Sequence, residues 1–189
     1  MSERHSDVSL FLEHDIYLPR RTVAIIGEVD LDMFKTVLKS LHALDGKGKT
    51  INVIINSEGG DVTQGMAIYD ALNGCKDYVR GMVFGEVSSA ASFILQACDE
   101  RFMSPSSYMM LHLGSENHPE THPENIKRWN EKHQKDAKWM ESVYLKKIKE
   151  KKPRFTRAQL QSLLRFDTIL SPQEAIDLGL ADDVQEHFE

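Results

Sequence analysis

Apolar residues along the chain fall into two kinds of segment. Residues 22–27 (TVAIIG), 51–56 (INVIIN) and 78–84 (YVRGMVF) are short apolar runs rich in β-branched residues, which is typical of buried strands. Over 34–44 and 66–72, apolar residues recur every three or four positions, which indicates amphipathic helices, and Asp30 is the predicted N-cap of the first. This alternation predicts an α/β fold with a largely parallel sheet.

The second half of the chain adds short strands and one long helix. Segments 101–103 and 107–113 are predicted strands, and the small-residue segment from Ser88 to Cys98 is a predicted helix. The proline-containing stretch 114–125 is a predicted loop. From about Glu124 to Lys151, a narrow apolar stripe runs along an otherwise charged helix. Such a helix can pack as an arm or against another subunit.

Two capping boxes indicate further short helices near the C-terminus. Thr156 is followed three positions later by Gln159, and Ser171 by Glu174, which is the spacing that lets each pair satisfy the first amides of a helix. No linker is long enough to divide the chain, so we expect residues 1–189 to form a single domain.

Composition and charge narrow the possible functions. The 189 residues carry a formal net charge of −6, which argues against a nucleic-acid-binding or membrane-surface protein. No stretch approaches the ~20 apolar residues of a membrane span, and the N-terminal run VSLFL is too short for a signal peptide. Cys75 and Cys98 lack metal or redox spacing, so we expect reduced thiols in a cytoplasmic protein.

Two predicted strand ends carry residues suited to chemistry. In open α/β sheets, functional sites collect at the C-terminal ends of strands, here INSEGGD and GEVSSAAS. Gly59 and Gly60 free the backbone to turn its amides toward a ligand, although an ordinary turn is the alternative. In GEVSSAAS, Ser88 or Ser89 is either a helix N-cap or a nucleophile beside helix amides that stabilise negative charge.

A serine nucleophile needs a base, and one histidine is well placed. His112 follows a predicted apolar strand, where a purely structural histidine is the alternative. His118 and His122 lie in HPETH, a proline-flanked loop without an obvious third ligand, so no metal site is predicted. Asp167 precedes ILSPQE, and its position alone does not distinguish it from a capping aspartate.

Four segments, taken in order, resemble the caseinolytic protease family of ClpP serine peptidases. INSEGGDVTQGMAIYD is similar to the family's INSPGG segment, and GEVSSAASFILQA is similar to the segment that carries its nucleophile. RFMSPSSYMMLH is similar to the segment that ends in the catalytic histidine, and DTILSPQEAIDLGLADDV to the one that begins with the catalytic aspartate. The resemblance runs from about Asp15 to Val184, and four motifs in register are far more specific than any one alone.

The resemblance implies a serine endopeptidase that needs no cofactor or metal. Matched residue by residue, the nucleophile position falls on Ser89, the base on His112 and the orienting acid on Asp167. The backbone amides of Gly60 and Ala90 match the oxyanion hole. The expected substrates are unfolded polypeptides or short peptides.

The resemblance also implies a fold and an assembly. The expected fold is the ClpP or crotonase-like one, with repeated β-β-α units and a protruding handle, here the loop and helix of about 114–151. Residues 1–16 match the N-terminal axial segment. Family members form two stacked seven-membered rings, so we expect a homo-oligomer.

Several departures concern the family's ATPase partners, which dock on aromatic-lined clefts. Three positions that are usually aromatic are Asn52, Ile54 and Gly74 here, and the N-terminal segment is short. Removing aromatic anchors weakens docking. We therefore expect a different AAA+ unfoldase or none, as in a divergent stand-alone peptidase or a viral ClpP-like protease. The proline of SPGG is Glu58 here, which an extended turn accommodates.

Two other functions remain open. A crotonase-fold acyl-CoA hydratase or isomerase would share the double-glycine oxyanion hole but would not need Ser89, His112 and Asp167 together. A non-catalytic ring subunit would have lost members of this set, whereas this chain has all three.

Overall fold

The computed structural model describes residues 16–17, 20–114 and 122–186. Within these ranges, eight strands form one sheet in the order β1-β2-β3-β4-β5-β8, with β6 beside β4 and β7 beside β6. The strands are β1 (Ile16–Tyr17), β2 (Thr22–Val29), β3 (Ile51–Gly60), β4 (Val79–Ser88), β5 (Glu100–Met103), β6 (Tyr108–Leu111), β7 (Thr168–Leu170) and β8 (Asp183–Val184). The helices are α2 (Leu31–Leu44), α3 (Val62–Asn73), α4 (Ala90–Leu95), α5 (Pro123–Lys151), α6 (Arg157–Leu164) and α7 (Pro172–Leu178).

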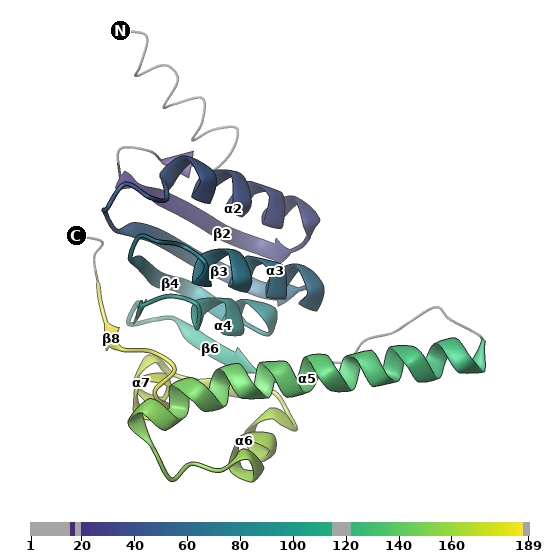
Figure 1. Ribbon diagram of the computed structural model, residues 1–189. Coiled ribbons are helices and arrows are strands. Elements are labelled where there is room, and N and C mark those ends of the chain that lie inside the picture. Colours follow the sequence, from purple (N-terminus) through teal and green to yellow (C-terminus); the bar gives the residue numbers. More distant parts are fainter. Residues whose placement is uncertain (1–15, 18–19, 115–121, 187–189) are drawn as a thin grey trace, which may run out of the picture.

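The predicted α/β class is confirmed. Strands β2, β3 and β4 pair in parallel, and each is followed by a helix. Figure 1 shows α2, α3 and α4 side by side over one face of the sheet. Along the first half of β3, fully buried residues alternate with half-buried ones, because only one face of the strand is fully covered by the core.

Strands β3 and β4 run further than predicted. β3 continues through the SEGG segment, after a register shift against β4 between Ile55 and Ser57. β4 pairs first with β5 and then, over its last residues, with β6. Each long strand therefore acts as two successive β segments before a helix, which is the β-β-α unit of the expected fold.

The predicted helix from Ser88 to Cys98 is shorter than expected. Ser88 is the last residue of β4 and pairs with Met110 in the sheet, so α4 begins only at Ala90 and ends at Leu95. The strand predicted over 107–113 is also shorter, and His112 lies just beyond the end of β6.

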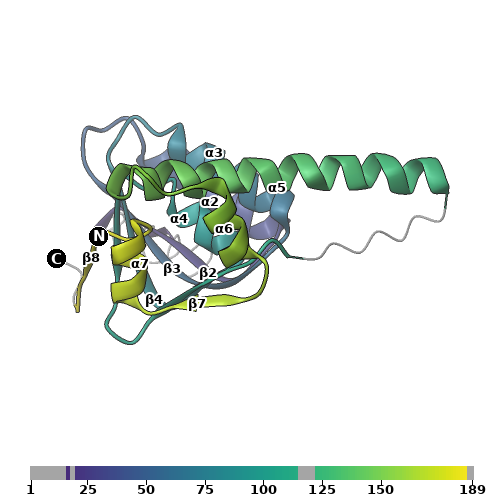
Figure 2. The ribbon, with the colours of Figure 1, turned by 90° about the horizontal axis from the view of Figure 1, so that it is seen from below.

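The long helix α5 begins within one residue of its predicted start. Figures 1 and 2 show that its first half extends away from the sheet, while its second half crosses the body of the molecule. Met140, Tyr144 and Ile148 are buried on that second half. Most of the predicted loop at 114–125 and most of the N-terminal segment 1–16 lie outside the described residues.

The predicted caps hold helices in place. The Asp30 carboxylate accepts a hydrogen bond from the amide of Met33 at the start of α2. Thr156 and Ser171 form the capping boxes of α6 and α7. Strands β1, β7 and β8, each two or three residues long, were not predicted. None of the helices in the described part of the chain is long and apolar enough to cross a membrane.

Candidate active site

Strand pairing brings together three residues that are distant in sequence. β4 pairs in parallel with β6, and the Ser89 amide just after β4 donates to the Met110 carbonyl at 3.0 Å. β6 pairs antiparallel with β7, so His112, which follows β6, lies opposite Asp167, which precedes β7. The three residues predicted as nucleophile, base and orienting acid thus meet at one edge of the sheet.

Two hydrogen bonds connect these side chains. His112 Nε2 lies 2.7 Å from Ser89 Oγ, and His112 Nδ1 lies 3.0 Å from Asp167 Oδ1. An ionised carboxylate only accepts hydrogen bonds, so Nδ1 carries the proton and Nε2 accepts from the serine hydroxyl. This tautomer is the one in which histidine can act as a general base.

His112 and its partner Asp167 differ in exposure. The Asp167 side chain is 70% exposed and that of His112 is 27% exposed. Water screens the Asp167 charge, so this carboxylate acts more by orienting the imidazole than by a strong electrostatic field.

Ser89 has an unusual backbone conformation. Its φ of 51° and ψ of −121° put a non-glycine residue at positive φ, which costs about 1–3 kcal/mol. Its side chain makes no capping bond to α4 and is turned toward His112 instead. Ser88, the alternative candidate, donates its hydroxyl proton to Glu86 Oε2 at 2.8 Å. Of the two serines, Ser89 is the one hydrogen-bonded to the histidine, and it also occupies the N-cap position of α4, so of the two roles open to Ser88 that of helix cap is wrong.

The double glycine lies against the backbone at Ser89. A Cβ built on Gly59 would fall 2.6 Å from the Ser88 carbonyl oxygen and 2.8 Å from the Ala90 nitrogen. A Cβ on Gly60 would fall 2.4 Å from the Val29 carbonyl oxygen. The two glycines are the last residues of β3, so the interpretation of this segment as an ordinary turn is corrected. The predicted oxyanion-hole residues Gly60 and Ala90 therefore lie on two segments that touch.

Two polar residues that the sequence analysis passed over support this region. The Asn56 side-chain oxygen accepts a hydrogen bond from the Glu86 amide at 3.2 Å, across the bend in β4. The Ser57 hydroxyl donates to the Gly27 carbonyl at 2.6 Å and accepts from the Gly59 amide at 3.1 Å. For Ser57 the sequence carried a signal, because a polar residue directly after an apolar strand must find hydrogen-bond partners if it is buried, as Ser57 is.

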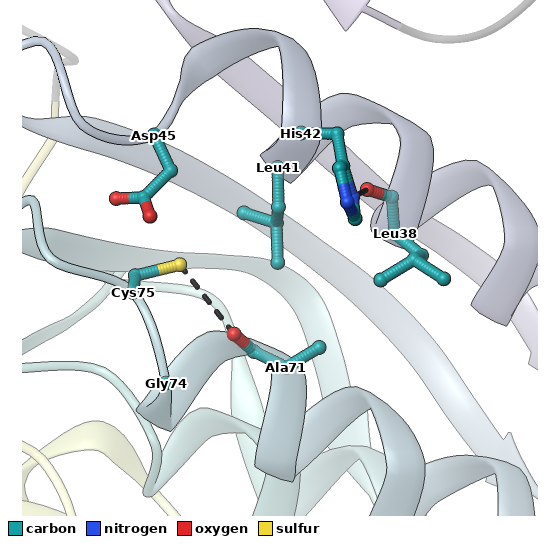
Figure 3. Close-up of a pocket in the computed structure, with 7 residues that line it drawn as sticks. All are labelled: Leu38, Leu41, His42, Asp45, Ala71, Gly74 and Cys75. Atoms are coloured by element: carbon teal, nitrogen blue, oxygen red, sulfur yellow. Dashed lines mark hydrogen bonds between the residues drawn. The ribbon is translucent and has the colours of Figure 1, made fainter.

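A separate cavity of about 250 Å³ lies between α2 and α3 (Figure 3). It shares no residue with the candidate active site. Gly74, one of the positions where the family has an aromatic residue, forms part of its wall, and Cys75 Sγ donates to the Ala71 carbonyl. The lining residues are Leu38, Leu41, His42, Asp45, Ala71, Gly74 and Cys75.

Both cysteines are free thiols. Burial raises the pKa of Cys75 to about 11 and that of Cys98 to about 12, so both are protonated at neutral pH. Among the described residues, no group of three or more His, Cys, Asp or Glu side chains could hold a metal ion. His118 lies outside the described part of the chain.

This chain is similar to a known protein family and to a solved structure. A sequence model of the Clp protease family matches residues 9–188. Among solved structures, that of a ClpP1 mutant from Listeria monocytogenes is similar to this chain with a TM-score of 0.78 and 25% sequence identity. The similarity covers 95% of this chain and 96% of that one.

Proposed function

Because the chain belongs to the Clp protease family, we propose that it is a serine endopeptidase that uses Ser89, His112 and Asp167. The observation that carries the proposal is the pair of hydrogen bonds, 2.7 Å and 3.0 Å long, that link the three side chains. The substrates are unfolded polypeptides or short peptides, and no metal or cofactor takes part.

The chemistry follows from the tautomer of His112. Nε2 takes the Ser89 proton as Oγ attacks the peptide carbonyl, and the amides of Gly60 and Ala90 stabilise the oxyanion. The proton then passes to the leaving amine as the C–N bond breaks and the acyl-enzyme forms. Water, activated by the same histidine, hydrolyses the ester and regenerates Ser89. Asp167 keeps Nδ1 protonated throughout.

The two alternatives account for less of the geometry. An acyl-CoA hydratase or isomerase has no use for a serine hydroxyl held at 2.7 Å from an imidazole nitrogen. A non-catalytic subunit gives no reason for the positive φ of Ser89, which costs folding free energy.

We propose that the active sites are enclosed in a homo-oligomer of two stacked seven-membered rings, as in the family. The protruding half of α5 is suited to contact between rings, because Ile126 and Trp129 on it are 41% and 39% exposed. The reduced thiols fit a cytoplasmic location.

An unusual unfoldase partner, or none, is part of the proposal. The Asn52 amide group donates to the Arg20 carbonyl at 3.0 Å, and Gly74 contributes no side chain to the α2–α3 cavity, whose lining residues include no Phe, Tyr or Trp. The prediction is that a standard Clp ATPase does not stimulate the peptidase. ATP-dependent degradation of a folded substrate by that pair would contradict it.

The test of the activity compares the purified chain with Ser89→Ala and Asp167→Asn. Cleavage of short fluorogenic peptides and labelling by a fluorophosphonate are measured on fractions from a sizing column. We expect Ser89→Ala to abolish both, and Asp167→Asn to lower kcat about 10³–10⁴-fold by allowing the wrong tautomer. Equal activity in wild type and Ser89→Ala would overturn the proposal.

A further inference from the structure

A pair of buried hydroxyl groups lies behind Ser89, outside the three residues proposed for catalysis. Ser92 Oγ donates a hydrogen bond to the Ser89 carbonyl oxygen at 2.6 Å and lies 2.6 Å from the Tyr144 hydroxyl oxygen. Ser92 is 0% exposed and Tyr144 is 1% exposed. A buried polar pair of this kind is costly unless both groups are satisfied.

The order of the protons in this chain of hydrogen bonds follows from the groups themselves. The Ser89 carbonyl can only accept, so the single Ser92 hydroxyl proton goes to it. The Tyr144 hydroxyl must therefore donate to Ser92 Oγ. Burial raises the pKa of Tyr144, which keeps the phenol neutral and able to donate.

The Ser89 carbonyl needs such support because α4, the helix that follows it, is short. α4 has six residues, too few for helix cooperativity to hold its first turn. The Ser89 side chain bonds to His112 and makes no cap for α4. Ser92 compensates from within the helix, since its amide at 3.0 Å and its hydroxyl at 2.6 Å both bond to the Ser89 carbonyl.

Tyr144 extends this support to a distant element. It lies on the buried second half of α5, 52 residues from Ser92 in sequence. The helix whose other half protrudes from the body is thus hydrogen-bonded, through one serine, to the backbone of the residue proposed as nucleophile (Figure 2).

We propose that Ser92 and Tyr144 are positioning residues that hold the Ser89 backbone in the strained conformation in which its hydroxyl meets His112. The inference rests on the proposed function, because it assigns these residues a role in the reaction of Ser89. Neither residue touches the substrate, so the loss of either lowers the rate of acylation and leaves substrate binding unchanged. The bond from Tyr144 also makes the rate depend on the position of α5.

The experiment is a double-mutant cycle of Ser92→Ala, Tyr144→Phe and the double variant, with Ser40→Ala as the matched control. Ser40 is also 0% exposed, and its hydroxyl donates to the Thr36 carbonyl at 2.7 Å within α2, which is separated from α4 by α3 (Figure 1). Each protein is measured for Tm, for the rate of labelling by a fluorophosphonate, and for kcat and KM on one fluorogenic peptide.

Stability and activity are expected to separate. Ser92→Ala leaves the Tyr144 hydroxyl buried without a partner and lowers Tm by about 5 °C. The double variant removes both polar groups and recovers most of that loss. We expect kcat and the labelling rate to stay about 10-fold below wild type in Ser92→Ala and in the double variant, with KM unchanged. Tyr144→Phe keeps the bond from Ser92 to Ser89, so we expect a loss of about 3-fold.

Two outcomes overturn this inference. One is a double variant whose kcat recovers together with its Tm, which would make the pair merely structural. The other is a loss in Ser92→Ala no larger than that in Ser40→Ala. Both are read against a wild type whose labelling depends on Ser89. If the wild type lacks that dependence, it is the proposed function that fails.

Discussion

At the level of single residues, three neighbouring serines make different hydrogen bonds. Ser88 closes a strand and bonds to Glu86, Ser89 faces His112, and Ser92 bonds back to the carbonyl of Ser89. Their side chains are chemically identical, and the backbone decides between them. Only Ser89 has a positive φ, which turns its side chain out of the strand direction toward the histidine.

Substitution of Gly59 tests whether its close packing against the backbone at Ser89 matters for activity. Its φ is +92°, and a Cβ there would fall 2.6–2.8 Å from atoms of Ser88, Ser89 and Ala90. We expect Gly59→Ala to lower kcat by more than 100-fold, because the backbone that presents the nucleophile and one oxyanion amide must shift. Gly48→Ala is the control, since φ there is +67° and nothing lies within 4 Å of the added Cβ. A similar loss in both variants would mean that left-handed strain alone, and not contact with Ser89, causes the effect.

At the scale of elements, the helices differ in how their first turns are held. α2, α3, α6 and α7 begin with a side-chain cap, whereas α4 and α5 do not. α4 is instead surrounded by other elements and is completely buried. Beside the proposed chemistry, tertiary packing therefore holds α4 in place without a side-chain cap.

The cap of α7 can be tested by itself. The Ser171 hydroxyl accepts from the Glu174 amide and donates to the Glu174 carboxylate at 2.7 Å. We expect Ser171→Ala to lower Tm by about 2–4 °C, the usual cost of a lost cap in a chain of this size. Ser171→Thr keeps the hydroxyl and should unfold close to the wild-type temperature. Circular dichroism during heating measures both, and equal Tm values for wild type and Ser171→Ala would contradict the prediction.

At the scale of the whole molecule, one ion pair joins the middle of the chain to its C-terminal part. The Arg101 side chain in β5 makes two hydrogen bonds to the Asp182 carboxylate, at 2.7 Å and 3.0 Å, and the Arg101 amide makes a third at 2.8 Å. Its side chain is 6% exposed and that of Asp182 is 39% exposed. Arg101 also donates to Gln96 Oε1 at 2.7 Å, so its buried charge has a hydrogen-bond partner besides Asp182.

This ion pair predicts how stability depends on pH. Burial raises the pKa of Asp182, but the hydrogen bonds and charge of Arg101 outweigh it and hold the pKa below its ordinary value. The stabilisation is therefore fully present above the pKa of the unfolded chain, about 3.9, and is lost as the pH falls through the lower folded value.

The matching experiment is urea unfolding of wild type and Asp182→Asn across this pH range. We expect the variant to be less stable near pH 7 by about 1–2 kcal/mol, a modest value because water reaches the carboxylate. The difference should shrink as the pH falls below about 4. A difference that does not change with pH would show that Asp182 acts through packing or neutral hydrogen bonds.

Most of the elements and the candidate residues could be predicted from the sequence. Local signals such as apolar periodicity, capping boxes and the ordered motifs need only neighbouring residues to be read, so Asp30, Thr156 and Ser171 were found as caps. The motifs also led to Ser89, His112 and Asp167 before any distance between them was known.

The tertiary structure alone decided which groups meet. Ser89 and His112 are 23 residues apart, His112 and Asp167 are 55 apart, and Ser92 and Tyr144 are 52 apart. Their contacts depend on the register of β4, β6 and β7 and on where α5 crosses α4, and local patterns encode neither of these. The extra length of β3 and β4 has the same cause, because a strand ends where its partners end.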